Sequence, residues 1–242
     1  MEQCWADKVA LITGANCSSG KCLAECLVGK GMKVIGIASQ VDKVKALAEE
    51  LKSKPGKLFP LQCDLSNQND ILHVLEWVEK NLGAIDILIN NAANNIDISL
   101  QSGEMEDWKK MFDVNFLGLT WMTKEALKLM KKKGRYFQNV RKSKKYASVS
   151  RMQIFRILLL FCSTGIDNGI IVNINDASWL KAPINCDRPI SPAYIASKFA
   201  LNFLTESLRS ELAQLESNIK VIVSILLCLF LLLELLSLKF YS

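Results

Sequence analysis

The fold is decided by the stretch Lys8-Val9-Ala10-Leu11-Ile12-Thr13-Gly14-Ala15-Asn16-Cys17-Ser18-Ser19-Gly20. Here an apolar run ends in a loop with glycines and then passes into a helical pattern. In such an arrangement a nucleotide pyrophosphate can meet backbone N–H groups at a helix N-terminus. Glycines also serve ordinary turns, so the loop predicts a phosphate site only with support from the rest of the chain.

Five further apolar runs rich in valine and isoleucine are predicted to be buried strands. They span 33–38, 57–63, 85–90, 169–175 and 219–225, and stretches with helical spacing lie at 41–52, 67–82, 104–133 and 192–217. Strands that alternate with helices predict a doubly wound parallel sheet of the Rossmann type. The length fits one such α/β domain over residues 1–225.

Two segments break this alternation. Connections in α/β units typically take about 2 to 6 residues, yet residues 135–164 separate the helix that ends near Gly134 from the next strand. Residues 226–242 then form an apolar tail. We hypothesise that translated intron or mispredicted coding sequence follows in both places, after Gly134 and from near Val223 onward.

The tail raises the question of a membrane. If 219–225 is a strand, the apolar residues left at 226–238 would form a helix about 20 Å long, against a hydrocarbon core of about 30 Å. The length therefore disfavours a membrane span. A reductase tethered to a membrane through this tail stays as an alternative.

Charge and cysteine usage exclude other classes. The formal charge is +6, but seven of the thirty Lys and Arg residues lie in 135–164, where no acid occurs. The remainder is nearly neutral, which disfavours a nucleic-acid partner. The eight cysteines include no Cys-x-x-Cys pair and no signal peptide precedes them, so we expect reduced thiols, a cytoplasmic location and no metal site.

The stretch Tyr194-Ile195-Ala196-Ser197-Lys198 carries the chemistry. Residues four apart on a helix share a face, and a cationic amine beside a phenol favours the phenolate. A phenol, whose ordinary pKa is about 10, could then act as a general acid or base. The alternative is an ordinary helix start with a solvated lysine, which two other motifs disfavour: Asp64 after the third strand and Asn90-Asn91-Ala92-Ala93 after the fourth.

In order and spacing these motifs resemble the short-chain dehydrogenase/reductase family, whose patterns are T-G-x-x-x-G-x-G, N-N-A-G, a helix Asn, a Ser and Y-x-x-x-K. The resemblance implies an NAD(P)-dependent oxidoreductase that interconverts an alcohol and a carbonyl by hydride transfer. Tyr194 would exchange a proton with the substrate oxygen, and Lys198 would also hold the nicotinamide ribose. Asn115 matches the helix Asn that supports a proton relay.

The resemblance also implies the cofactor contacts. Asp64 matches the adenine contact, and the other matching positions are Thr13, Gly14, Ser18, Gly20, Asn90 and Ala92. Ser39, after the second strand, could donate to a 2′-phosphate with Lys43 nearby, whereas Asp42 opposes this. The balance favours NADP(H) slightly over NAD(H).

The sequence departs from the family at three positions. Ser18 replaces the second glycine, which lets the backbone approach the pyrophosphate, and Ala93 replaces the last glycine of N-N-A-G. Asp176 stands at the catalytic serine and would bring negative charge beside the substrate oxygen, so we select Ser178, on the same strand face, instead. These departures leave open a catalytically impaired or inactive protein, or a truncated isoform.

Within the family, Trp5-Ala6-Asp7-Lys8-Val9-Ala10 and the helix 104–133 look most like insect farnesol dehydrogenase-like members. That likeness implies a small apolar alcohol or carbonyl as the substrate. Family resemblance further implies a homo-oligomer, a dimer or a tetramer.

Overall fold

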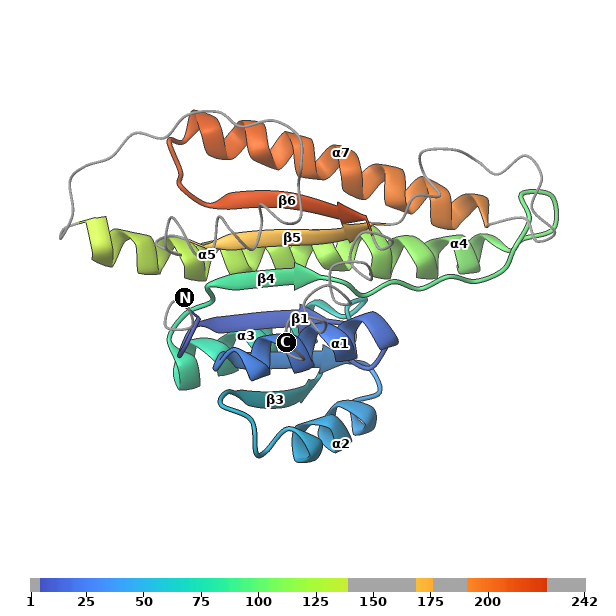
Figure 1. Ribbon diagram of the computed structural model, residues 1–242. Helices are drawn as coiled ribbons and strands as arrows, with labels where there is room; N and C mark the ends of the chain where they lie inside the picture. The colour runs from blue at the N-terminus through green and yellow to red at the C-terminus, as the bar shows by residue number, and fades with distance from the viewer. Residues whose placement is uncertain (1–4, 139–168, 176–190, 226–242) are drawn as a thin grey trace, which may run out of the picture.

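The computed structural model describes residues 5–138, 169–175 and 191–225 (Figure 1). Its strands form one six-stranded parallel sheet in the order β3-β2-β1-β4-β5-β6. The strands are β1 (Val9–Thr13), β2 (Lys33–Ala38), β3 (Lys57–Gln62), β4 (Ile87–Asn90), β5 (Ile170–Asn175) and β6 (Lys220–Ile225). The predicted doubly wound sheet is confirmed, with strand ends within two residues of those expected.

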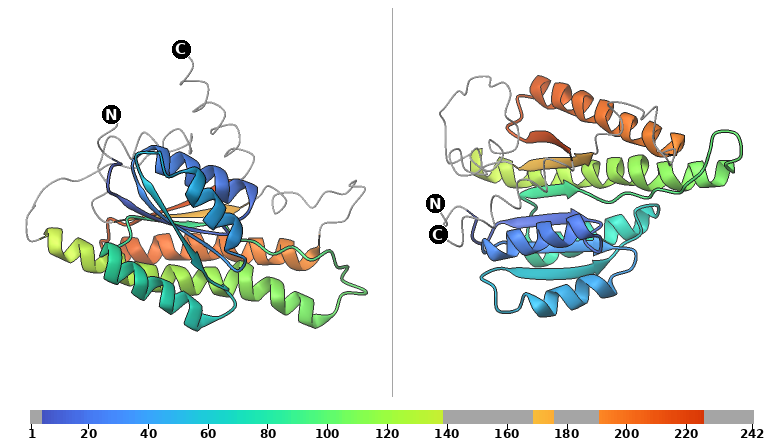
Figure 2. Two further views of the ribbon diagram at one scale, coloured as in Figure 1. Left: turned by 90° about the horizontal axis from the view of Figure 1, so that it is seen from below. Right: turned by 45° about the vertical axis from the view of Figure 1, so that its right-hand side comes forward.

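Helices cover both faces of the sheet, as Figure 2 shows. The helices are α1 (Ser18–Gly29), α2 (Asp42–Glu50), α3 (Gln68–Leu82), α4 (Met105–Phe112), α5 (Leu119–Gln138) and α7 (Pro192–Gln214). Alternate strand residues feed two cores: Ala10 and Ile12 pack in the core of α1 and α2, whereas Leu11 packs in that of α3, α5 and α7. Burial on both faces explains why the strands are nearly continuous apolar runs.

The predicted helix 104–133 differs from the observed one in two ways. A π-helical segment, η2 (Asp113–Gly118), lies between α4 and α5, so the helix is not α-helical throughout. α5 also continues through Gly134 to Gln138, because a single glycine costs a helix only about 1 kcal/mol and its neighbours are helix formers. The first four residues of the predicted insertion are therefore helical.

The remainder of the insertion and the tail 226–242 lie outside the described residues. In the part of the chain that the structure covers, no helix has both the length and the apolarity needed to cross a bilayer.

The topology fixes where a ligand can bind. The chain builds the sheet outward from β1 to β3 and then returns to β4, so the strand order reverses between β1 and β4. Ligands of doubly wound sheets bind in the crevice outside the carboxyl ends of the strands at such a point. The loops that follow Thr13 and Asn90 meet there.

Candidate active site

The loop after β1 is packed too tightly for side chains at two positions. Gly14 has a φ of +67°, and a Cβ placed there would lie 2.8 Å from the Cα of Ala92. A Cβ on Gly20 would lie 2.3 Å from the carbonyl oxygen of Gly14. Glycine is therefore required at both. The first turn of α1 that follows contains no acidic residue, so its N-terminus can accept an anion.

Asn91 and Thr13 hold this loop against the end of β4. The Asn91 Nδ2 donates to the carbonyl oxygens of Thr13 (3.0 Å) and Gly14 (3.2 Å), and the Ser19 hydroxyl donates to the Asn91 Oδ1 (2.8 Å). The Thr13 hydroxyl accepts from the backbone N–H groups of Asn91 and Ala92, both at 2.9 Å. Thr13 is fully buried, so its hydroxyl stabilises the loop from the protein interior and is not exposed to a ligand.

Cys17 precedes α1, and the pKa of its thiol is lowered, unlike the pKa values of Cys26 and Cys63. Burial alone would raise its pKa, but hydrogen bonds with the side chains of Ser19 and Asn91 and with the backbone N–H groups of Gly20 and Ser19 lower the pKa below the ordinary value. The Sγ lies 3.3 Å from the Ser19 hydroxyl and 3.4 Å from the Asn91 Nδ2. The loop therefore favours negative charge at this point.

A cavity of about 500 Å³ opens beside the loop. Its lining includes four of the predicted cofactor residues, Gly14, Ser39, Asp64 and Ala92. The Asp64 Oδ1 accepts from the N–H (2.9 Å) and the hydroxyl (2.7 Å) of Ser66. Within the described ranges its other oxygen makes no hydrogen bond and is available to a ligand.

Two other predicted cofactor residues lie elsewhere around the loop. Ser18 is exposed at the first position of α1. Asn90 is fully buried, and its Nδ2 donates to the Asn173 Oδ1 (2.7 Å) and the Thr123 hydroxyl (2.8 Å). The Asn173 Nδ2 in turn donates to the Thr205 hydroxyl at 2.8 Å. Asn90 thus belongs to a buried polar chain that joins β4 and β5 to α5 and α7.

Tyr194 and Lys198 lie on one face of α7, with the Lys198 Nζ 5.6 Å from the centre of the tyrosine ring. Lys198 is only 3% exposed, and its Nζ donates to the carbonyl oxygen of Ile174 at 3.4 Å. The Asn175 Nδ2 donates to the carbonyl oxygen of Lys198 at 3.1 Å. The lysine is therefore packed against the carboxyl end of β5, which rules out a solvated surface side chain.

Asn115 lies in the π-helical segment η2 and is fully buried. Its Oδ1 accepts from the N–H of Asn94 (2.6 Å), and its Nδ2 donates to the Asn94 carbonyl oxygen (2.8 Å) and to the Ser197 hydroxyl (3.1 Å). The Ser197 hydroxyl donates to the carbonyl oxygen of Tyr194 at 2.7 Å. The structure therefore brings Asn115 into contact with the helix of Tyr194 and Lys198.

Asn91 and Ser197 are site residues whose roles the sequence does not predict. The one available signal was position, since Asn91 follows Asn90 in its motif and Ser197 lies between Tyr194 and Lys198. Asp176 and Ser178 lie outside the described residues. Within the described ranges, no group of three or more His, Cys, Asp or Glu side chains is placed to hold a metal ion.

Several known proteins are similar to this chain in sequence. The family model described as short chain dehydrogenase matches residues 8–136. Dehydrogenase/reductase SDR family member 11 of Mus musculus is 35% identical over 218 residues, which are 89% of this chain and 71% of that protein. The farnesol dehydrogenase of Aedes aegypti is 34% identical over 221 residues, 90% of this chain and 75% of that protein.

Solved structures share the fold. A short-chain type dehydrogenase/reductase from Mycobacterium marinum superposes with a TM-score of 0.70 at 24% identity, covering 90% of this chain and 74% of that one. A metagenomic short-chain oxidoreductase in complex with NADP gives a TM-score of 0.69 at 22% identity, covering 91% of this chain and 83% of that one.

Proposed function

The chain belongs to the short-chain dehydrogenase/reductase family, a family of NAD(P)-binding oxidoreductases, and from this premise we propose that it is an NADP(H)-dependent alcohol dehydrogenase or carbonyl reductase with Tyr194 as general acid and base. The observation that carries the proposal is the placement of Tyr194 beside the buried Lys198 at the carboxyl end of β5. A buried ammonium group interacts with a neighbouring phenol more strongly than a solvated one does.

The cavity, of about 500 Å³, is within the usual range of about 300 to 1,000 Å³ for small-molecule sites, and its lining includes neither Tyr194 nor Lys198. We propose that it takes the adenosine and pyrophosphate part of a dinucleotide. We propose that the backbone at Gly14 and the N-terminus of α1 hold the pyrophosphate. Asp64 would accept a hydrogen bond from the adenine, and Lys198 would hold the nicotinamide ribose.

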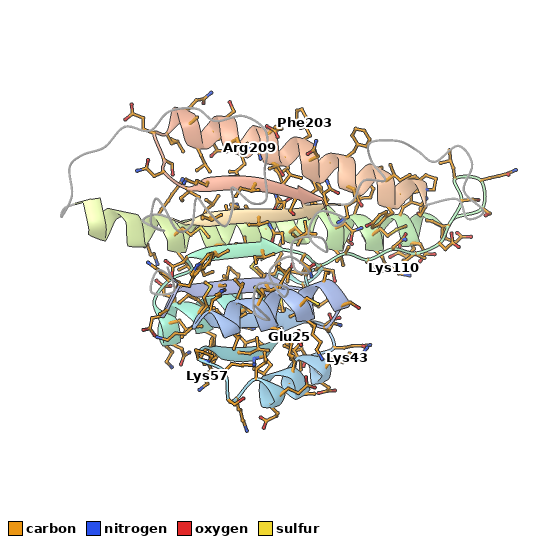
Figure 3. All side chains as sticks on the ribbon, viewed as in Figure 1. Glu25, Lys43, Lys57, Lys110, Phe203 and Arg209 are labelled. Atoms are coloured by element: carbon orange, nitrogen blue, oxygen red, sulfur yellow. The ribbon has the colours of Figure 1, made fainter. Side chains whose placement is uncertain are left out.

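The surroundings of Ser39 support NADP(H) over NAD(H). Asp42, the acid that opposes a 2′-phosphate, forms an ion pair with Lys45 at 3.2 Å. Lys43 has no acidic partner within the described ranges. Figure 3 shows Lys43 projecting from α2 at the edge of the sheet where the strands end. Ser39 lines the cavity, and we propose that Lys43, four positions further along the chain, supplies the positive charge for the 2′-phosphate.

The proton chemistry follows from the chain's own groups. When bound, the nicotinamide supplies or accepts the hydride. In carbonyl reduction the Tyr194 hydroxyl would donate its proton to the substrate oxygen, and in alcohol oxidation the phenolate would accept that proton. Lys198 favours the phenolate by its positive charge. We propose that Ser178 donates a hydrogen bond to the same substrate oxygen.

We further propose a small apolar alcohol or carbonyl as the substrate, in line with the farnesol dehydrogenase among the relatives. The test is turnover of farnesol and farnesal with NADP(H) and NAD(H), compared with polar alcohols of similar size. Activity that Tyr194→Phe abolishes while cofactor affinity is retained supports the proposal. Activity that survives this substitution contradicts it.

Cytoplasmic location and homo-oligomerisation are proposed from family membership and are checked by fractionation and sedimentation.

A second candidate is a cofactor-binding protein without turnover. It is favoured by Asp176 at the position of the family's serine and by Ser18 at that of a glycine. Thermal stabilisation by NADPH without turnover of any alcohol or carbonyl would select this candidate.

A membrane tether through the tail is tested by sedimentation with vesicles, before and after deletion of residues 226–242.

A further inference from the structure

We propose that Ser197 is a positioning residue for proton transfer, because its hydroxyl links the first turns of α7 to Asn115 and through it to the cavity wall. The inference rests on the function proposed above, since it concerns the placement of Tyr194. It assigns Ser197 no contact with substrate or cofactor.

Ser197 is fully buried, and its hydroxyl is engaged both as donor and as acceptor. It donates to the carbonyl oxygen of Tyr194 at 2.7 Å and accepts from the Asn115 Nδ2 at 3.1 Å. The two partners come from different helices, η2 and α7, and Asn115 lies 82 positions away in sequence. A buried hydroxyl with both roles satisfied fixes the geometry of the groups around it.

Asn115 connects Ser197 to the wall of the cavity through Asn94. The Asn115 Oδ1 accepts from the Asn94 N–H, and the Nδ2 donates to the Asn94 carbonyl oxygen and to the Ser197 hydroxyl. Asn94 lines the cavity. The side-chain donors of Asn115 are therefore already bonded to protein groups. The amide acts by fixing the position of the Ser197 hydroxyl relative to the backbone of Asn94.

Loss of the Ser197 hydroxyl would release both ends of this link. The Asn115 Nδ2 would lose one acceptor in a buried place, and the Tyr194 carbonyl would lose one donor. Tyr194 and the wall at Asn94 could then shift relative to each other. Proton transfer requires hydrogen-bond distance between Tyr194 and the substrate oxygen, so such a shift lowers kcat. The dinucleotide contacts at Gly14 and Asp64 do not include Ser197.

The test compares Ser197→Thr with Ser197→Val, two variants of nearly equal shape of which only the first keeps a hydroxyl. Ser207→Ala, on the exposed side of α7, is the control. We expect Ser197→Val to lower kcat about tenfold relative to Ser197→Thr, with KM for NADPH unchanged within about twofold. Amide hydrogen exchange of the segments that contain Asn94 and Tyr194 should be faster in Ser197→Val than in Ser197→Thr. Ser207→Ala should match the wild type in every measurement.

Equal kcat and equal exchange in Ser197→Thr and Ser197→Val would overturn the proposal. Should the added volume prevent both variants from folding, Ser197→Ala compared with the wild type replaces the pair, with the same expectations. Should the wild type turn over no alcohol or carbonyl, the proposed function fails, and exchange alone then decides the link: faster exchange without the hydroxyl supports it and unchanged exchange overturns it.

Discussion

Cys17 shows how one side chain takes its character from the loop around it. Four hydrogen-bonding partners outweigh the effect of burial and lower the pKa of its thiol. Burial has the opposite outcome at Cys26, whose pKa is raised, and at Cys63, where burial and the charges of Asp70 and Asp64 raise the pKa to about 12. Because the thiolate is the reactive form, these three cysteines should differ in reactivity.

We expect iodoacetamide to alkylate Cys17 before Cys26 and Cys63 when the pH is raised. Because the pKa of Cys17 is lowered, its alkylation rate should reach half of its maximum at a pH below 9.0, the ordinary pKa of a thiol, whereas Cys63, with a pKa of about 12, should stay a thiol throughout. Cys17 lines the cavity, so bound NADPH should slow its alkylation. Peptide mass spectrometry measures each site. Equal labelling of Cys17 with and without saturating NADPH would contradict the proposed cofactor position.

Cofactor choice is tested at Lys43. Lys43→Glu should weaken NADPH binding about tenfold by placing negative charge near the 2′-phosphate, while NADH binding changes less than twofold. Lys54→Glu makes the same change of net charge at an exposed position before β3 and serves as the control. Titration of both variants with NADPH and with NADH measures the four dissociation constants. An equal loss of NADPH and NADH affinity would argue against a phosphate contact at Lys43.

At the residue scale the sequence was informative where partners are close in the chain. The pairing of Tyr194 with Lys198 follows from helical periodicity, and the structure confirms that they share a face. The roles of Asn91 and Ser197 could not be predicted, since their partners Thr13 and Asn115 lie 78 and 82 positions away. Contacts of this kind depend on the finished fold.

Among the helices and strands, the buried polar chain through Asn90 and Asn173 ties β4 and β5 to α5 and α7. Its members Asn90, Thr123, Asn173 and Thr205 are at most 5% exposed. Buried amides and hydroxyls cost stability unless they are paired, and here four elements are joined by hydrogen bonds between them, although the Asn90 Oδ1 has no partner among the described residues. The chain therefore fixes α7, the helix of Tyr194, onto β5.

Asn173→Ala should lower the free energy of unfolding by about 2 to 4 kcal/mol, because it leaves buried groups of Asn90 and Thr205 with fewer partners. Asn81→Ala makes the same change at an exposed helix position and should cost about 0.5 kcal/mol or less. Urea unfolding measures both. A cost for Asn173→Ala no greater than that for Asn81→Ala would show that the polar chain does not stabilise α7.

Helix ends and helix type were the least predictable features. The apolar pattern over 104–133 continues without interruption, and six residues of π-helix change the spacing too little to be recognised. The extension of α5 through Gly134 was missed because glycine was interpreted as a stop signal. Asn115, whose amide contacts both Asn94 and Ser197, lies within this π-helical segment.

At the scale of the whole molecule, the sheet could be predicted because strand and helix patterns alternate from Val9 to Ile225. Because the paired strands all run parallel, the loops that follow Thr13 and Asn90 lie at the same, carboxyl end of the sheet. Ser178 and most of the segment 135–164 fall outside the described residues, so their roles stay predictions.

We propose that residues 135–164 and those beyond 223 derive from intron or mispredicted coding sequence. Sequencing of the mature transcript should then show messages that join the family-like segments directly. Recovery of both segments in mature message and in peptides from the protein would reject this origin.

The reaction that we propose is hydride transfer to a carbonyl with proton transfer by Tyr194. The most direct measurement follows deuterium from NADPH labelled at the nicotinamide C4 into the alcohol product by mass spectrometry, with farnesal as substrate and the full chain as enzyme. We predict deuterium in the product with the wild type and none with Tyr194→Phe, although both bind NADPH equally. NADPH binding by the wild type without any deuterium in the product would contradict the claim and select the inactive alternative.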